Sequence, residues 1–431
     1  MSPQNRTEGA NGEWGRGPSR RSFLGVGAGL AAGAAGGAGL VAATDGESPR
    51  HDAAPLAPGN GQVVPASFKA AHQPGILTGP ALASLVAAFH CRDRDRRALA
   101  GTLRRLSAEM DALMAGRRPQ DVPAGQPPAD SAILLGQGRQ PVLVTLSVGA
   151  SLFDERYGLA DRRPAELVPM GVLANDRLDP ARTHGDLLVL IQADHPDVCV
   201  HALRRLTRAA GGSLSPAWSQ DGFARPDPVA TAGATGNRNL LGFKDGTGNP
   251  DAADPALMDQ VVWVGAGDGE PEWAVGGTYV AVRLIRLLVE QWDRTSLDAQ
   301  ERVMGRRKLS GAPLDGEKET DVPRYAEDPG GERTPLDSHI RLANPRTAGP
   351  DKGMLRKGFN YARGLDADAL LDQGLVFVSY QRRLANFLQA QERLKGEPME
   401  AFTRPEGGGF YYALPGAPGS GGYLGQRLVE S

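Results

Sequence analysis

Asp245 stands in a glycine-rich segment whose composition suits proton transfer beside a flat ligand. The segment runs from Leu241 to Pro250 with the sequence LGFKDGTGNP, and its single carboxylate lies among three glycines. Glycine has no Cβ, so the backbone there can approach a planar group closely. A carboxylate in such a place can accept and return protons. The alternative is that Asp245 belongs to an ordinary polar turn.

His339 stands in a second polar cluster. The sequence DSHIRLANPR covers residues 337–346, and MLRKGF follows at 354–359. Imidazole is a common ligand of haem iron, and guanidinium groups bind carboxylates through two parallel hydrogen bonds. One histidine among several arginines is therefore typical of a site for an anionic, metal-centred cofactor. A lone histidine with a purely structural role has the same pattern in sequence.

The remaining histidines and cysteines form no recognisable metal-binding set. His195 and His201 flank Cys199 on one expected helix but lie on different faces of it, and a zinc site would need further ligands. His72 is either part of a polar turn before the first strand, which we expect, or part of the lining of a pocket. Cys91 and Cys199 stand in no Cys-x-x-Cys pair, which argues against a zinc ribbon, a disulfide scaffold and a covalently attached c-type haem. The sequence leaves open whether they pair.

The composition is that of a globular protein with a sizeable core. The chain has 431 residues, of which 40% are hydrophobic, and 48 Lys and Arg face 50 Asp and Glu, for a formal net charge of -2. At about 150 residues per domain, this length allows two or three domains. The chain has no basic excess, which argues against nucleic-acid binding.

The first 43 residues have the features of an export signal. Arg20 and Arg21 precede an uncharged stretch from Ser22 to Thr44 that consists mainly of glycine and alanine. The stretch is too weakly hydrophobic for a good membrane span, and a paired arginine before it is typical of a twin-arginine signal. We predict a signal peptide over 1–43 that is read by the twin-arginine translocase, with an extracellular, periplasmic or cell-envelope location. This pathway carries folded proteins, which favours a cofactor enzyme.

Hydrophobic patterns predict two similar halves after the signal. Strands are expected at 85–91, 142–148, 187–192, 278–285, 374–380 and 409–414, and helices at 99–113, 196–208, in the stretch that ends near 304, and at 381–394. Strand–helix–strand units that recur twice predict two ferredoxin-like α+β domains, each an antiparallel sheet with helices on one face. We place a flexible linker at 44–64, the N-terminal domain at 65–225 and the C-terminal domain at 226–431.

Residues 305–372 carry few strand or helix signals. The segment is rich in proline, glycine and charged residues, and it contains His339. A loop of this length in a compact protein is more often functional than incidental. We therefore expect a long functional loop.

Together the two polar clusters resemble the dye-decolourising peroxidase family, in particular its twin-arginine-exported deferrochelatase/peroxidase branch. GFKDG at 242–246 matches the family's Gly-x-x-Asp-Gly signature, HIRLANPR at 339–346 matches its axial-histidine motif, and its distal arginine falls on Arg356. Further segments that look like the family follow in its order, namely HQPGI at 72–76, SLFDERYGL at 151–159, ADHPDVCVHALRR at 193–205 and GGGFYYALPG at 407–416. The resemblance covers roughly residues 65–428. One departure is Lys357, which stands where a second arginine is common and lacks the planar fork.

The resemblance implies a fold and a cofactor. The fold would be duplicated ferredoxin-like α+β, of the dimeric α+β barrel-like superfamily, and the cofactor one haem b per chain, bound mainly by the C-terminal domain. His339 would be the iron ligand, with an unidentified acceptor on its other ring nitrogen. The remaining contacts would come from Gly246, Thr247 and Gly248 on the distal side and from Asn344, Pro345 and Arg346 at the proximal edge or propionates.

The resemblance also implies two catalytic roles. Asp245 would take a proton from hydrogen peroxide and return it to the outer oxygen. Arg356, which would also contact the haem, would stabilise the negative charge that develops as the O–O bond breaks. Electrons would then come from dyes, phenols or other organic donors.

Two other functions remain open at this point. A deferrochelatase would release iron from haem with the porphyrin intact, and its partners would include an iron-uptake system or a copper oxidase. A non-catalytic haem carrier is disfavoured because transport needs no pair such as Asp245 and Arg356. The sequence predicts neither the physiological donor nor the oligomeric state.

Overall fold

The structure, a computed structural model, describes residues 63–120, 122–225, 237–347, 349, 353–419 and 421–430. The predicted signal peptide at 1–43 and nearly all of the predicted linker at 44–64 lie outside these residues. Within the described ranges, no helix is long and apolar enough to cross a membrane.

The first half of the described chain has four strands and two main helices in the order βαββαβ. They are β1 (Ala83–Cys91), α1 (Arg96–Met114), β2 (Val142–Gly149), β3 (Leu187–Ala193), α2 (Pro196–Ala210) and β4 (Leu214–Phe223). Antiparallel pairing places the strands in the order β4-β1-β3-β2. The first half is therefore a ferredoxin-like unit.

Local sequence explains where its helices begin and end. The Asp95 side chain accepts a hydrogen bond from the Ala98 N–H and caps α1. α2 begins with Pro196. Proline lacks an N–H, which costs nothing in the first turn of a helix because the N–H groups there have no partner within the helix. The helix α2 ends at Gly211, which adopts the left-handed φ of 61° that favours glycine.

The second half repeats the strand order of the first. Its main elements are β7 (Thr278–Leu287), α4 (Val289–Asp293), α5 (Leu297–Met304), α6 (His339–Ala343), β8 (Leu355–Leu365), β9 (Leu371–Gln381), α7 (Leu384–Leu394) and β10 (Thr403–Ala413). Shorter elements are β5 (Asn237–Arg238), β6 (Lys244–Asp245), α3 (Pro255–Val261) and α8 (Gln426–Glu430). The four long strands lie in the order β10-β7-β9-β8, again antiparallel.

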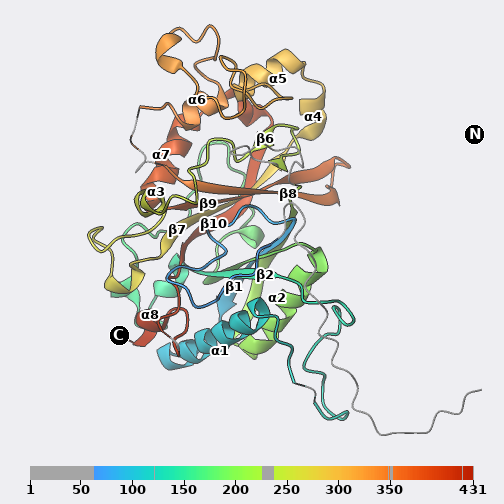
Figure 1. Cartoon of the computed structure of the whole chain (residues 1–431), viewed down its shortest axis with the longest axis vertical. Coiled ribbons are helices and arrows are strands. Elements are labelled where there is room, and N and C mark those ends of the chain that lie inside the picture. The colour runs from blue at the N-terminus through green and yellow to red at the C-terminus, as the bar shows by residue number, and fades with distance from the viewer. Residues whose placement is uncertain are drawn as a thin grey trace, which may run out of the picture. The chain divides into compact units, whose positions relative to one another are not determined.

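The two halves join into one closed eight-stranded barrel (Figure 1). At one seam Tyr411–Ala413 of β10 pairs with Ser147–Gly149 of β2, and at the other Phe223 of β4 pairs with Asn360 of β8. The helices α1 and α2 cover the strands of the first half, and α7 covers β7 and β9. The structure confirms the expected duplicated ferredoxin-like α+β fold and its barrel-like superfamily.

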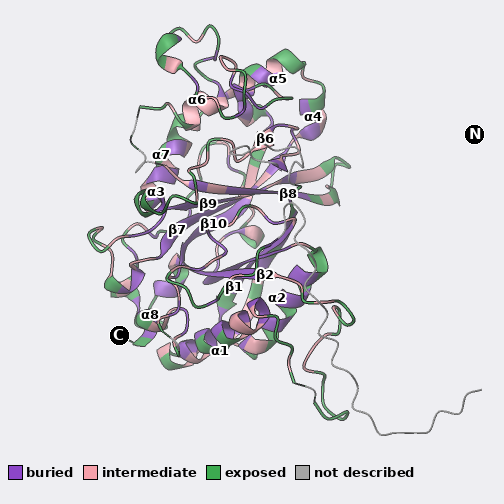
Figure 2. Ribbon diagram, in the orientation of Figure 1, coloured by how far each residue is buried: buried purple, intermediate pink, exposed green. Residues whose placement is uncertain are grey.

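Buried residues lie along the strands and on the helices that cover them (Figure 2), and the hydrophobic ones form clusters inside the barrel and under the helices. Along β1, Val86 and Ala88 belong to the cluster inside the barrel, whereas Leu85 and Ala87 pack in the cluster beneath α1 and α2. This alternation follows from the two-residue period of a strand. Since side chains fill the barrel, it is a packed core and not a pore, and a large ligand must bind outside it.

The segment 305–372 is more regular than expected. The strand β8 begins at Leu355 and pairs with β9 along its length, and β9 itself begins at Leu371. The prediction of one long loop was therefore wrong for residues 355–372. The reason is that Lys357 occupies an inward position of β8, where a hydrophobic residue would have completed the alternation typical of a strand.

Candidate active site

A cavity of about 860 Å³ lies on the outer face of the second-half strands. Every site residue predicted from the sequence lines this one cavity: Asp245, Gly246, Thr247, Gly248, His339, Asn344, Pro345, Arg346 and Arg356. Its walls also include hydrophobic side chains of β7, β9 and α7, among them Ile285, Leu287, Leu375, Phe377 and Phe387. All of its lining residues come from the second half of the chain. The volume is within the range of cofactor sites, roughly 300 to 1,000 Å³.

His339 opens the short helix α6 and is oriented by a carboxylate. Its Nδ1 lies 2.7 Å from Glu397 Oε2, and a third of its side chain, 33%, remains accessible. Burial lowers the pKa of His339, but the Glu397 carboxylate outweighs burial and raises it overall. A carboxylate on Nδ1 fixes the tautomer and leaves Nε2 to a metal. Glu397 is thus the acceptor that sequence reasoning could not identify.

Asp245 presents a buried carboxylate oxygen without a hydrogen-bond partner. Oδ2 makes no hydrogen bond within the described residues. Burial raises the pKa of Asp245, while the Arg356 guanidinium and the Gly246 N–H oppose that shift. The carboxylate fits against β8 because Gly358 has no side chain, and a Cβ there would lie 2.2 Å from Oδ2. An unpaired, buried acid is a group available for proton transfer.

Arg356 is held in place by the same glycine-rich segment. Its Nη2 donates to the Thr247 carbonyl oxygen at 2.8 Å, and its Nε donates to Asn249 Oδ1 at 3.2 Å. Asn249 also bonds the Arg356 backbone on both sides, with its Oδ1 accepting from N at 3.1 Å and its Nδ2 donating to O at 2.8 Å. Burial lowers the pKa of Arg356, and Asp245 opposes this shift. Asn249 was part of the predicted motif, but its role was not predicted.

Further guanidinium groups line the cavity without a carboxylate partner among the described residues, among them those of Arg306 and Arg346. Arg306, 7% exposed, donates to the carbonyl oxygens of Gly311 and Glu319 at 2.7 and 3.1 Å. Arg346 adopts a left-handed φ of 63°, and it lowers the pKa of Arg306 after the larger effect of burial. A buried cation without an anion, such as Arg306, is costly. The ligand of this cavity is therefore expected to bring negative charge.

These features fit a haem. The hydrophobic walls suit a porphyrin, the Nε2 of His339 suits its iron, and Arg306 and Arg346 suit its carboxylates. Asp245 and Arg356 share the cavity with His339 and would act on a small molecule bound beside the cofactor. Arg306 was not among the predicted residues because no motif marks it.

Other residues singled out in the sequence lie elsewhere. Lys357 points away from the cavity and donates to Gly75 O at 2.6 Å and Gln192 Oε1 at 3.2 Å inside the barrel, where burial lowers its pKa to about 7. It is therefore not a contact at the edge of the cofactor. His201 pairs with Asp130 at 2.8 Å. Cys91 and Cys199 are both buried free thiols.

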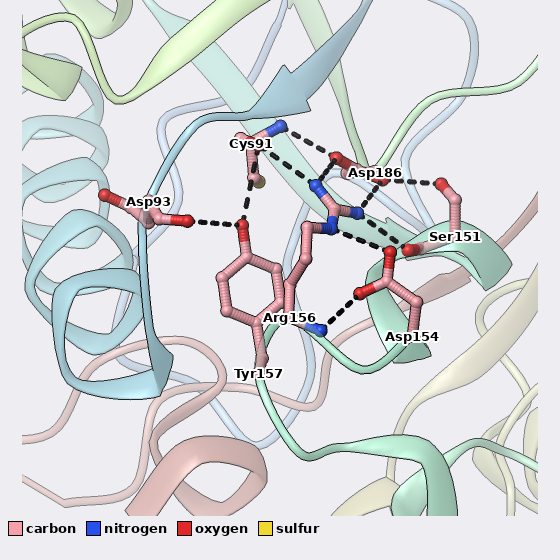
Figure 3. Close-up of polar contacts among 7 residues, drawn as sticks. All are labelled: Cys91, Asp93, Ser151, Asp154, Arg156, Tyr157 and Asp186. Atoms are coloured by element: carbon pink, nitrogen blue, oxygen red, sulfur yellow. Dashed lines mark hydrogen bonds and ion pairs between the residues drawn. The ribbon is translucent and has the colours of Figure 1, made fainter.

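The SLFDERYGL segment forms a polar network in the first half (Figure 3). Both terminal nitrogens of Arg156 donate to Asp186 at 3.0 Å. Asp186 also accepts from Ser151 Oγ at 2.6 Å and from the Cys91 N–H at 2.8 Å. Every oxygen of this carboxylate is used and none of these residues lines the cavity, so the network joins the end of β1 to the segment after β2.

Comparison with known families gives two matches. Residues 73–224 match "Dyp-type peroxidase, N-terminal", and residues 236–418 match "Dyp-type peroxidase, C-terminal".

Curated relatives and solved structures agree with these matches. The chain is 42% identical over 420 residues to a deferrochelatase of Yersinia pestis, with 96% of this chain and 95% of the relative covered. It is 45% identical over 367 residues to a deferrochelatase of Escherichia coli strain K12, with 84% and 87% covered. Ferric DtpA of Streptomyces lividans superposes with a TM-score of 0.76 at 36% identity, over 86% of this chain and 98% of that chain. A DyP-type peroxidase of Cellulomonas bogoriensis gives 0.76 at 34%, over 87% and 100%.

Proposed function

Because the chain belongs to the Dyp-type peroxidase family, whose members are haem-dependent enzymes, we propose that it binds one haem b in the cavity of its second half and reduces hydrogen peroxide there. The observation that carries this proposal is the buried, unpartnered Oδ2 of Asp245 beside Arg356, in the cavity that His339 also lines. The haem, when bound, supplies the electrons that reduce peroxide and regains them from organic donors.

The proximal side of the cavity holds and orients the cofactor. His339 offers Nε2 to the iron, and Glu397 keeps the imidazole in the tautomer that allows this. Arg306 and Arg346 neutralise the carboxylates of the porphyrin. The hydrophobic walls contributed by β7, β9 and α7 exclude water from its faces.

The distal side moves one proton and stabilises one charge. Asp245, when ionised, accepts the proton from the inner oxygen of hydrogen peroxide and then donates it to the outer oxygen, which leaves as water. The Arg356 guanidinium stays protonated and therefore acts through its charge. It stabilises the oxygen that becomes negative as the O–O bond breaks. Asn249 and the Thr247 carbonyl keep its guanidinium on this side.

A second candidate function is iron release. The curated relatives at 42% and 45% identity are named deferrochelatases, so the same cavity is a candidate for the removal of iron from haem with the porphyrin intact. In that case an iron-uptake system or a peroxide-using copper oxidase would be the expected partner. Either role agrees with the proposed export of the chain by the twin-arginine translocase to the cell envelope or beyond.

The test is a stopped-flow comparison of Asp245→Asn and Arg356→Leu with the wild type, all loaded with haem, after one equivalent of hydrogen peroxide. Each variant should lose roughly 100- to 10,000-fold in the rate at which the haem spectrum changes. Asp251→Asn is the matched control, because Asp251 lines the same cavity and its Oδ1 accepts only a local backbone N–H.

The outcomes separate the two functions. Wild-type rates in both distal variants would refute the peroxidase proposal. Iron that appears in a chelator, together with metal-free porphyrin fluorescence from haem supplied to the wild type, would favour iron release instead.

A further inference from the structure

Glu319 is a buried carboxylate, between α5 and α6, that binds residues on both sides of Asp245. Its Oε2 lies 2.6 Å from Lys244 Nζ, and its Oε1 accepts a hydrogen bond from Thr247 Oγ1 at 2.9 Å. The two side chains of the ion pair are 11% and 5% exposed. Lys244 directly precedes Asp245 in the chain and Thr247 follows two residues after it, so one side chain spans the segment that carries the proposed proton acceptor.

Asp245 depends on such support because little else holds its carboxylate. Among the residues that the structure describes, its Oδ2 has no hydrogen-bond partner, and the backbone N–H of Gly246 is the hydrogen-bond donor that lowers its pKa. The direction in which this carboxylate points therefore follows from the backbone between Lys244 and Thr247. A backbone of glycine-rich composition does not fix its own geometry.

The chain around Glu319 is shaped to receive this contact. The Glu319 carbonyl oxygen accepts from Arg306 Nη1 at 3.1 Å, which ties the segment to the cavity wall. Gly311 has a left-handed φ of 78°, and a Cβ there would lie 2.8 Å from Lys244 Cδ and 3.2 Å from Glu319 Cγ. The ion pair thus passes through a space that only glycine leaves open.

We propose that Glu319 is a positioning residue for Asp245, which fixes the Lys244–Thr247 backbone and cancels the charge of Lys244 beside the proton acceptor. The proposal rests on the proposed function, because Glu319 touches neither substrate nor cofactor and acts only through Asp245. The other charged groups that act on Asp245 are Arg356 from β8 and His339 from α6. Neither charge is removed when Lys244 or Glu319 is replaced.

The charges of Lys244 and Glu319 lead to a prediction that would not follow if their contact were purely structural. Glu319→Gln keeps an acceptor for Thr247 but removes a negative charge near Asp245, which favours ionised Asp245 and should move the acid limb of the peroxide reaction to lower pH. Lys244→Met removes a positive charge near Asp245, which disfavours ionised Asp245 and should move that limb to higher pH. The double variant should return the limb towards its wild-type position.

The experiment measures two rates against pH in the haem-loaded proteins, the reaction with hydrogen peroxide and the binding of cyanide to the ferric form. Cyanide binding needs the same proton acceptor, since hydrogen cyanide must lose its proton, but involves no turnover. At the plateau Glu319→Gln should be about 10-fold slower with peroxide, less than the roughly 100-fold loss ascribed to a 1 Å misplacement. Glu301→Gln is the matched control, because Glu301 is 8% exposed and binds Arg307 and the Lys308 N–H instead.

Opposite shifts of the acid limb in the two single variants, with an unmoved limb in Glu301→Gln, would support the proposal. Shifts in the same direction, or none, would overturn it. In that case the peroxidase proposal stands as long as Asp245→Asn abolishes the limb. A limb that persists in Asp245→Asn would overturn both proposals, because Glu319 would then have no proton acceptor to position.

Discussion

Gly358→Ala tests whether the position of the Asp245 carboxylate matters for proton transfer, because it moves this group without changing its chemical nature. The added Cβ would lie 2.2 Å from Asp245 Oδ2 and 2.9 Å from its Cγ. Since non-bonded heavy atoms rest about 3.5 Å apart, Oδ2 would have to retreat by about 1.3 Å. The strand cannot retreat instead, because Gly358 lies within the continuous pairing of β8 with β9, opposite Phe377.

The expected result is a slow enzyme that is otherwise intact. Misplacement of a reacting group by about 1 Å costs on the order of 100-fold in rate, so the reaction with hydrogen peroxide should slow by about that factor. The Asp245 side chain can rotate away, and the fold should lose little. We expect the free energy of unfolding to change by less than about 1 kcal/mol, since alanine also restricts the unfolded chain.

Stopped-flow spectroscopy of the haem-loaded protein measures the rate, and thermal unfolding with a haem titration measures integrity. Gly171→Ala is the control, because a Cβ there would meet nothing within 4 Å. A wild-type rate in Gly358→Ala, with haem bound normally, would refute the reasoning that the place of Oδ2 determines proton transfer.

Three further predictions concern the iron ligand, the proton acceptor and the signal. His339→Ala should yield protein that is largely free of haem, because the one strong metal bond is lost; a Soret band of wild-type strength would exclude His339 as the ligand. Burial raises the pKa of Asp245 even after the opposing effect of Arg356. Because a base works only when ionised, the rate of the peroxide reaction should fall as the pH drops through this raised pKa, which lies above the ordinary range of aspartate. The same fall in Asp245→Asn would contradict this assignment. Replacement of Arg20 and Arg21 by Lys keeps the charge but should stop export, as measured by fractionation of cells; undiminished export would point to another route.

The sequence predicted the residues of the cavity that stand in continuous motifs. Local composition marked Asp245 and His339 as candidates, and the resemblance of their motifs to a known family assigned their roles. Glu397 and Glu319 were not found, although each contacts a predicted segment directly. Each is brought to its partner by the fold across more than fifty residues, and an isolated glutamate in sequence has no pattern that would reveal such a contact.

The same limit applies to the fold. Strands that are mostly apolar, such as β1 and β7, were predicted to within a few residues. β8 was missed because three consecutive residues of this strand serve the cavity or the barrel interior and interrupt its hydrophobic pattern. Arg356 faces the cavity, Lys357 is bound inside the barrel, and Gly358 makes room for Asp245. Functional demands therefore removed the pattern by which the strand would have been recognised.

The first half of the molecule contributes no lining residue to the cavity, but it supports the cavity through the barrel. Lys357, next to Arg356, is bound to Gly75 and Gln192 of the first half, and Asn360 further along β8 pairs with Phe223. The first half thus supports, from inside the barrel, the strand that carries Arg356. Substitutions in the first half should therefore change catalysis by changing the alignment of β8.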